Sequence, residues 1–181
     1  MHLSDQELLA QFADHSTKEK GYTAVIKKYQ EKLYWHIRRM VIDHADADDV
    51  LQNTFIKVWK GLENFREDSQ LYTWLYRIAT NESLSFLAQQ QKRATVSMDV
   101  VGSTLENKIK ADTNFDGNRL EWKLQVAIQS LPEKQRLVFN LRYYDALPYE
   151  EMSKILDTSE GALKASYHHA AKKIEAFLKE N

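Results

Sequence analysis

The apolar residues of this chain recur every three or four positions over long stretches that contain almost no helix-breaking residue. Only 5 glycines and 2 prolines occur among the 181 residues. Because these two residue types most often interrupt helices, the periodic stretches can persist as amphipathic helices. The sequence therefore predicts an all-α fold, in a chain long enough to bury a hydrophobic core.

The first block of helical pattern, residues 1–93, contains three predicted helices. Apolar residues step by three and four through residues 25–41, as on one face of a helix. A second helix is expected to begin at the acidic stretch HADADD, with Asp46 as its N-terminal cap. A third runs from about residue 70 to residue 91. These helices predict one N-terminal helical domain.

A polar stretch, residues 94–119, interrupts the pattern. It holds two glycines and no sustained period, which predicts a flexible linker. Helical periodicity returns in residues 120–181, where Pro132 suits the start of a helix. The chain is therefore expected to form two small helical domains joined by this linker.

The second domain ends in a pattern typical of a helix-turn-helix, with predicted helices over residues 149–156 and 160–179. Asp157 stands in the turn where glycine is common, and aspartate tolerates a left-handed conformation at some cost. On the second helix, Lys164 and His169 suit phosphates or guanine edges. Such a face would read DNA, although the exposed side of an ordinary helical hairpin has a similar composition.

Three aromatic residues, Tyr72, Trp74 and Tyr76, open the third predicted helix. One buried face cannot hold all three, because residues two apart on a helix point to different sides. Trp74 is assigned to the core. The two tyrosines either stack on unstacked nucleic-acid bases or pack against a neighbouring helix.

The composition excludes several classes of protein. The chain has no cysteine, so disulfides, thiolate zinc sites and a cysteine nucleophile are ruled out. No apolar run approaches the ~18 residues of a membrane span, and no signal-peptide pattern is present, so we expect a cytoplasmic protein without membrane insertion. No cofactor or metal site is expected. The formal net charge of −1 favours local rather than bulk electrostatic contact with DNA.

Two blocks of sequence resemble a known family. The stretch DADDVLQNTFIKVWKGLENFREDSQLYTWLYRIATNESL is similar to the region of extracytoplasmic-function (ECF) bacterial sigma factors that binds core polymerase and reads the minus-ten element. The stretch LQVAIQSLPEKQRLVFNLRYYDALPYEEMSKILDTSEGALKASYHHAAKKI is similar to their C-terminal region, which reads the minus-thirty-five element. The resemblance implies a factor that binds core RNA polymerase, directs it to promoters and helps melt them, without catalysing bond formation. It also implies an anti-sigma factor as a partner.

The resemblance assigns roles to individual residues, with a base flipped from the non-template strand held by the loop of residues 65–72. The expected polymerase contacts are Asp49, Gln52, Phe55, Lys57 and Trp59. The expected minus-ten contacts are Phe65, Ser69, Gln70, Leu71, Tyr72, Tyr76, Arg77 and Asn81. The expected minus-thirty-five contacts are Ser159, Lys164, Ala165, Ser166, His168 and His169.

Two other interpretations compete with a sigma factor. An autonomous helix-turn-helix regulator would need a dimer face or ligand pocket in the first domain and would bind a palindrome without polymerase. A helical enzyme could use Asp46, Asp48 and Asp49 to hold magnesium. Capping of a helix explains these aspartates equally well, and no second acidic cluster faces them.

Overall fold

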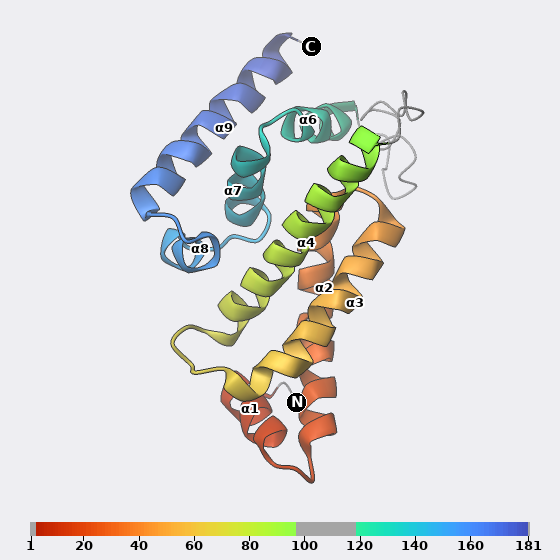
Figure 1. Cartoon of the computed structure of the whole chain (residues 1–181). Coiled ribbons are helices and arrows are strands. Elements are labelled where there is room, and N and C mark those ends of the chain that lie inside the picture. Colours follow the sequence, from red (N-terminus) through yellow and green to blue (C-terminus); the bar gives the residue numbers. More distant parts are fainter. Residues whose placement is uncertain (1–2, 97–118, 181) are drawn as a thin grey trace.

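The structure is a computed structural model that describes residues 3–96 and 119–180 (Figure 1). All regular secondary structure in those ranges is helical, which confirms the all-α prediction. In chain order the elements are α1 (Asp5–Ala13), α2 (Lys18–Val41), α3 (His44–Gly61), a 3-10 helix η1 (Leu62–Asn64), α4 (Leu71–Val96), α6 (Arg119–Gln129), α7 (Glu133–Tyr143), α8 (Tyr149–Leu156) and α9 (Glu160–Glu180). Most of the predicted linker, residues 97–118, lies outside the described residues.

Helix α1 is an element that the periodicity analysis does not predict. It begins at a capping box, in which Glu7 N donates to Ser4 Oγ at 3.3 Å and Ser4 N donates to the Glu7 carboxylate at 2.7 Å. The helix buries Leu8 and Phe12 as it packs on α2. The local pattern Ser-x-x-Glu before apolar residues is the signal that identifies it.

Helix α3 begins at the predicted acidic stretch but has a different cap. The side chain of Asp43 accepts a hydrogen bond from Asp46 N at 3.1 Å, so the prediction of Asp46 as the cap is wrong. Asp46 lies inside the first turn, and its carboxylate accepts a hydrogen bond from Gln90 Nε2 of α4 at 2.9 Å. An acidic residue in the first turn still stabilises the helix through its dipole.

The C-terminal helices follow the predicted punctuation. Pro132 directly precedes α7 as its N-cap residue. Helix α8 ends at Asp157, whose φ of 50° and ψ of 47° are left-handed, as the sequence predicts for the turn. Ser159 Oγ accepts a hydrogen bond from Ala162 N at 3.3 Å and so caps the first turn of α9. The helix-turn-helix is therefore formed by α8 and α9.

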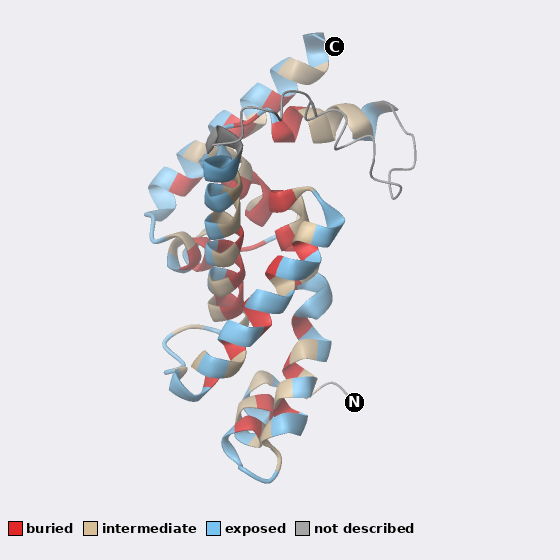
Figure 2. Cartoon of the chain, turned by 45° about the vertical axis from the view of Figure 1, so that its right-hand side comes forward, coloured by how far each residue is buried: buried red, intermediate tan, exposed pale blue. Residues whose placement is uncertain are grey.

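The N-terminal helices α1–α4 and the C-terminal helices α6–α9 share one hydrophobic core. Helix α8 packs on α4 and α7 packs on α2, and buried segments of both domains face one another (Figure 2). Leu141, Leu147 and Met152 belong to the same buried cluster as Leu33 and Leu75. A smaller cluster lies between α6, α7 and α9. The two domains are thus packed together in the isolated chain.

Candidate functional site

The outer face of α3 carries part of the expected polymerase-binding set. Asp49, Gln52 and Lys57 are exposed, and the Lys57 ammonium is paired with Glu82 of α4. Ile56 lies on the same side as Gln52, one turn further along, and is 47% exposed. A large aliphatic side chain surrounded by polar groups is suited to a protein contact. The sequence analysis did not single out Ile56. Its position outside the apolar stripe of the helix is the signal that could have identified it.

Phe55 and Trp59 do not lie on this outer face. Phe55 is only 8% exposed, and its carbonyl accepts a hydrogen bond from Tyr22 OH at 2.6 Å. The Trp59 ring meets Phe12 edge-on at 5.5 Å and Tyr22 at 4.8 Å between centroids. Phe55 is thus buried in the helical bundle, whereas Trp59 is half-buried at its edge, and their contact with polymerase stays a prediction.

The loop between η1 and α4 forms one side of a pocket of about 500 Å³. Four of the predicted base-holding residues line it: Phe65, Ser69, Gln70 and Leu71. Phe65 lies against Trp74 of α4 with 5.3 Å between ring centroids. The loop residues are thus brought together at a hollow. Leu71 itself is 2% exposed. Its side chain therefore packs behind the pocket wall and supports the loop.

Two of the predicted readers on α4, Arg77 and Asn81, are exposed. Tyr72 is half-buried and lies beside a groove of about 650 Å³ between the two domains. Trp35 and Lys32 of α2 line the same groove, and Trp35 is 41% exposed. The sequence analysis did not single out Trp35, which lies off the buried stripe of α2.

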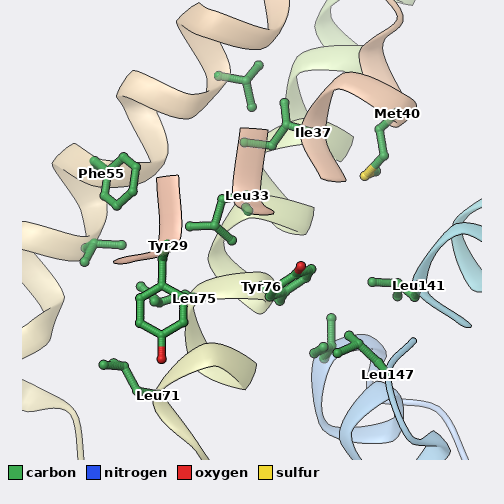
Figure 3. Packing of buried hydrophobic residues seen from close by; sticks show 14 of the residues in the cluster. Tyr29, Leu33, Ile37, Met40, Phe55, Leu71, Leu75, Tyr76, Leu141 and Leu147 are labelled. Carbon is green, nitrogen blue, oxygen red and sulfur yellow. The ribbon is translucent and has the colours of Figure 1, made fainter. Parts of the chain in front are cut away.

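Tyr76 is not exposed beside Tyr72. It is 4% exposed, and its hydroxyl lies 3.4 Å from Asp145 Oδ1 and donates to it. Burial, followed by the Asp145 carboxylate, raises the pKa of Tyr76 above the usual tyrosine value. Figure 3 shows Tyr76 on the side of α4 that faces Leu141 and Leu147. Of the two interpretations of the aromatics, packing against neighbouring helices is the one observed for Tyr76.

A polar cluster surrounds the carboxylate of Asp145, in the turn after α7. Arg39 Nη1 donates to Asp145 Oδ1 at 2.9 Å. His36 Nδ1 lies 3.2 Å from Asp145 Oδ2, and a carboxylate acceptor places the proton on that nitrogen. His36 is completely buried, and its Nε2 lies 2.9 Å from Thr80 Oγ1 of α4. This cluster ties α2 and α4 to the C-terminal domain.

A second polar contact joins α4 to α8. The Thr73 hydroxyl donates to the Glu151 carboxylate, which also accepts from Lys154 Nζ at 2.9 Å. Burial opposes the ionisation of Glu151, but the hydrogen bonds from Thr73 and Lys154 outweigh it and lower its pKa. An ionised carboxylate therefore lies at the edge of the loop pocket, which Glu150 also lines.

The predicted DNA-reading residues of the helix-turn-helix lie on one outer face of α9. Lys164, Ala165, His168 and His169 are exposed and Ser166 is half-buried, while Ser159 is exposed at the start of the helix. Lys164 Nζ lies 3.6 Å from Glu160 and 5.6 Å from the centre of the Tyr149 ring. The face is open to solvent and carries a basic side chain.

The magnesium interpretation gains no support from the described residues. Among them, no group of histidine, aspartate and glutamate side chains is arranged to hold a metal ion. None of the helices in the described ranges combines the length and the apolar character that a membrane crossing requires.

Comparison with known proteins identifies the family. The family models Sigma-70 region 2 and Sigma-70 region 4 match residues 25–93 and 121–174. The ECF RNA polymerase sigma-E factors of Salmonella typhimurium (strain LT2) and Escherichia coli (strain K12) are each 34% identical over 96% of this chain and 93% of their own length. The chain belongs to the ECF family of RNA polymerase sigma factors. The RNA polymerase sigma-H factor of Pseudomonas aeruginosa is 31% identical to this sigma factor over 88% of the chain and 87% of its own length.

Solved structures share the fold of this sigma factor. One is CnrH in complex with the cytosolic domain of CnrY, with a TM-score of 0.70 and 22% identity, covering 98% of each chain. Another is the sigma factor RpoE in complex with the anti-sigma factor NepR from Bartonella quintana, with a TM-score of 0.71 and 20% identity. That match covers 88% of this chain and 98% of the other.

As a member of this family, the protein is a transcription initiation factor that binds core RNA polymerase and directs it to promoters. The sequence resemblance is therefore confirmed. An autonomous helix-turn-helix regulator is not favoured.

Proposed function

We propose that this sigma factor binds core RNA polymerase through the outer face of α3, with Asp49, Gln52 and Ile56 in direct contact. Phe55 and Trp59 support that face from the bundle interior. The observation that carries the proposal is the exposure of Ile56, a large aliphatic side chain, among polar neighbours. An apolar centre with a polar rim is the composition of a protein interface.

The loop pocket and the exposed positions Arg77 and Asn81 of α4 are proposed to hold and read the melted minus-ten strand. Ser69 and Gln70 offer hydrogen bonds to a flipped base in the pocket, and Arg77 and Asn81 offer contacts along the strand. Tyr72 supplies a ring for stacking. Melting is assisted because a captured base offsets part of the free energy of unstacking.

The exposed face of α9 is proposed to contact the duplex minus-thirty-five element. Lys164, His168 and His169 are placed for phosphates or base edges, with Ser159 at the N-terminal end of the helix.

The protein contributes binding rather than bond-forming chemistry and acts in the cytoplasm, where polymerase works. An anti-sigma factor is a proposed partner, because the chain shares its fold with a sigma factor solved in complex with one.

Size-exclusion chromatography with core RNA polymerase, in the absence of DNA, tests the α3 assignment. The wild-type chain is expected to co-elute with polymerase, and Ile56→Glu is expected to weaken this binding at least about tenfold, as expected for a charge placed at the centre of an interface. Gln30→Glu, the same change of charge at an exposed position of α2, serves as the control. Equal binding by both variants would exclude the α3 face as the contact.

A further inference from the structure

We propose that helix α1 forms a second wall of the loop pocket and that Gln6, on its exposed side, hydrogen-bonds to the base captured there. The inference rests on the proposed role of the loop pocket in holding a flipped base of the minus-ten strand. The Sigma-70 region 2 model matches residues 25–93, so α1 precedes the matched segment. No role for this helix follows from that match. The placement of its side chains is what points to one.

Helix α1 lies next to the loop that joins η1 to α4 (Figure 1). Asp5, Gln6 and Leu9 line the loop pocket from α1, opposite residues of the loop. Leu9 and Phe65 also line an adjoining pocket of about 410 Å³, so these two apolar side chains lie where the two hollows meet. Apolar and aromatic side chains hold an extruded base by its faces. A base in the loop pocket therefore has α1 on one side and the loop on the other.

Hydrogen bonds at its N-terminal end fix α1 to α2. Asp5 Oδ1 accepts from Tyr29 OH at 2.6 Å and from Lys28 Nζ at 2.7 Å. Lys28 Nζ also donates to the Leu3 carbonyl at 2.9 Å. The Lys28 ammonium offsets the charge of the Asp5 carboxylate, which would otherwise oppose a strand that carries phosphates. A wall that takes part in recognition must be held in a fixed position, and α1 meets this requirement within the N-terminal domain alone.

Gln6 supplies the polar group of this wall. It is exposed and makes no hydrogen bond to any residue in the described ranges. Its carboxamide offers both a donor and an acceptor. An extruded base is read by hydrogen bonds to its Watson–Crick edge, where the four bases differ in donors and acceptors. Because Asp5 is already engaged and Leu9 is apolar, Gln6 is the side chain of the three that is placed to distinguish one base from another.

Selection of DNA by the holoenzyme tests the proposal. Core polymerase loaded with each variant is mixed with DNA in which a random single-stranded non-template segment of the minus-ten element is joined to an upstream duplex, and the bound DNA is sequenced. The wild-type chain should show a strong base preference at one or more positions of the strand. Gln6→Ala is expected to reduce the preference about threefold to tenfold at a single position, as for the loss of one hydrogen bond.

Gln6→Glu tests direct contact with the base. The carboxylate keeps an acceptor and loses the donor, so the preference at the same position should shift at least about threefold away from thymine, the base without an exocyclic amino group. Gln11→Ala, the same truncation on α1 but outside the residues that line the loop pocket, is the matched control and should leave every preference unchanged. Melting temperatures close to that of the wild-type chain show that α1 stays in place in all three variants.

The double variant Ser69→Ala/Gln70→Ala, on the loop side, separates this inference from the proposed function on which it rests. If the loop variant lowers a preference and Gln6→Ala lowers none, the loop reads the base without α1 and the inference is overturned. An effect of Gln6→Ala at a different position of the strand overturns it as well. If neither variant changes any preference, the loop pocket does not read the strand, and the proposed function of the pocket fails together with the inference.

Discussion

At the scale of single residues, the glycines at positions 21 and 161 differ in how closely other parts of the chain approach them. Gly21 of α2 lies where α1 crosses, and a Cβ atom there would be 2.6 Å from Phe12 N and 2.9 Å from the Gln11 carbonyl carbon. Backbone atoms cannot move aside as a flexible side chain can. Gly161, near the start of α9, has no atom within 4 Å of an added Cβ.

Gly21→Ala is therefore expected to destabilise the chain by about 1–3 kcal/mol through overpacking, despite the better helix propensity of alanine. Gly161→Ala, the control, should change stability only slightly and in the favourable direction. Urea unfolding of both variants measures the difference. A Gly21→Ala chain as stable as the Gly161→Ala chain would contradict the close crossing of α1 and α2.

Tyr76 makes a prediction about alkaline pH. Its pKa is raised above the usual 10.0 by burial and by Asp145, so neutral Tyr76 contributes its full stabilisation below pH 10 and loses it as the pH rises toward the raised value. Absorbance titration near 295 nm should show that Tyr76→Phe removes a late-titrating tyrosine. Tyr72→Phe is the comparison on the same helix. Loss of a transition near pH 10 from Tyr76→Phe would show that the side chain is exposed.

At the scale of elements, α3 carries buried residues on one side and the residues proposed to bind polymerase on the other. Phe55→Ala should destabilise the chain by about 3–5 kcal/mol, because a buried aromatic ring is removed from the core. Ile56→Ala, next to it, should leave the melting temperature nearly unchanged and weaken polymerase binding. Thermal unfolding and co-elution together separate the two effects. A stable Phe55→Ala chain that fails to bind polymerase would instead make Phe55 a contact.

The helix-turn-helix is the element that the sequence predicts best. Its two helices and its turn at Asp157 follow from local signals, and each is found in the structure. The cap of α3 was misassigned because several aspartates near its start satisfy the same preference. Helix α1 was missed although its capping box is equally local.

The covered face of α4 could not be predicted in the same way. Tyr76 and Asp145 are 69 residues apart in sequence, and His36 and Asp145 are 109 apart. Periodicity shows which residues of a helix lie outside its apolar stripe. It does not show whether another domain packs on those residues. The sequence therefore left the position of Tyr76 open. For the same reason, Ile56 became recognisable only when the bundle showed which side of α3 was free.

At the scale of the whole molecule, the shared core couples the unfolding of the two domains. Calorimetry of the wild-type chain is expected to show one cooperative transition. Asp145→Ala should split it into two, because the smaller cluster between α6, α7 and α9 can hold the C-terminal helices on its own. Glu133→Ala should keep the single transition. Two transitions in the wild-type chain would show that the domains are not coupled.

The distance in sequence between α4 and α8 also orders events during synthesis. Helix α4 leaves the ribosome before α8 exists, since roughly 60 residues separate Val96 from Leu156, and these take about 3 to 12 seconds to add at 5–20 residues per second. During that interval a growing chain presents Thr73, Tyr76 and Thr80 uncovered. Each newly made molecule therefore passes through an open form once, before its own C-terminal half closes over it.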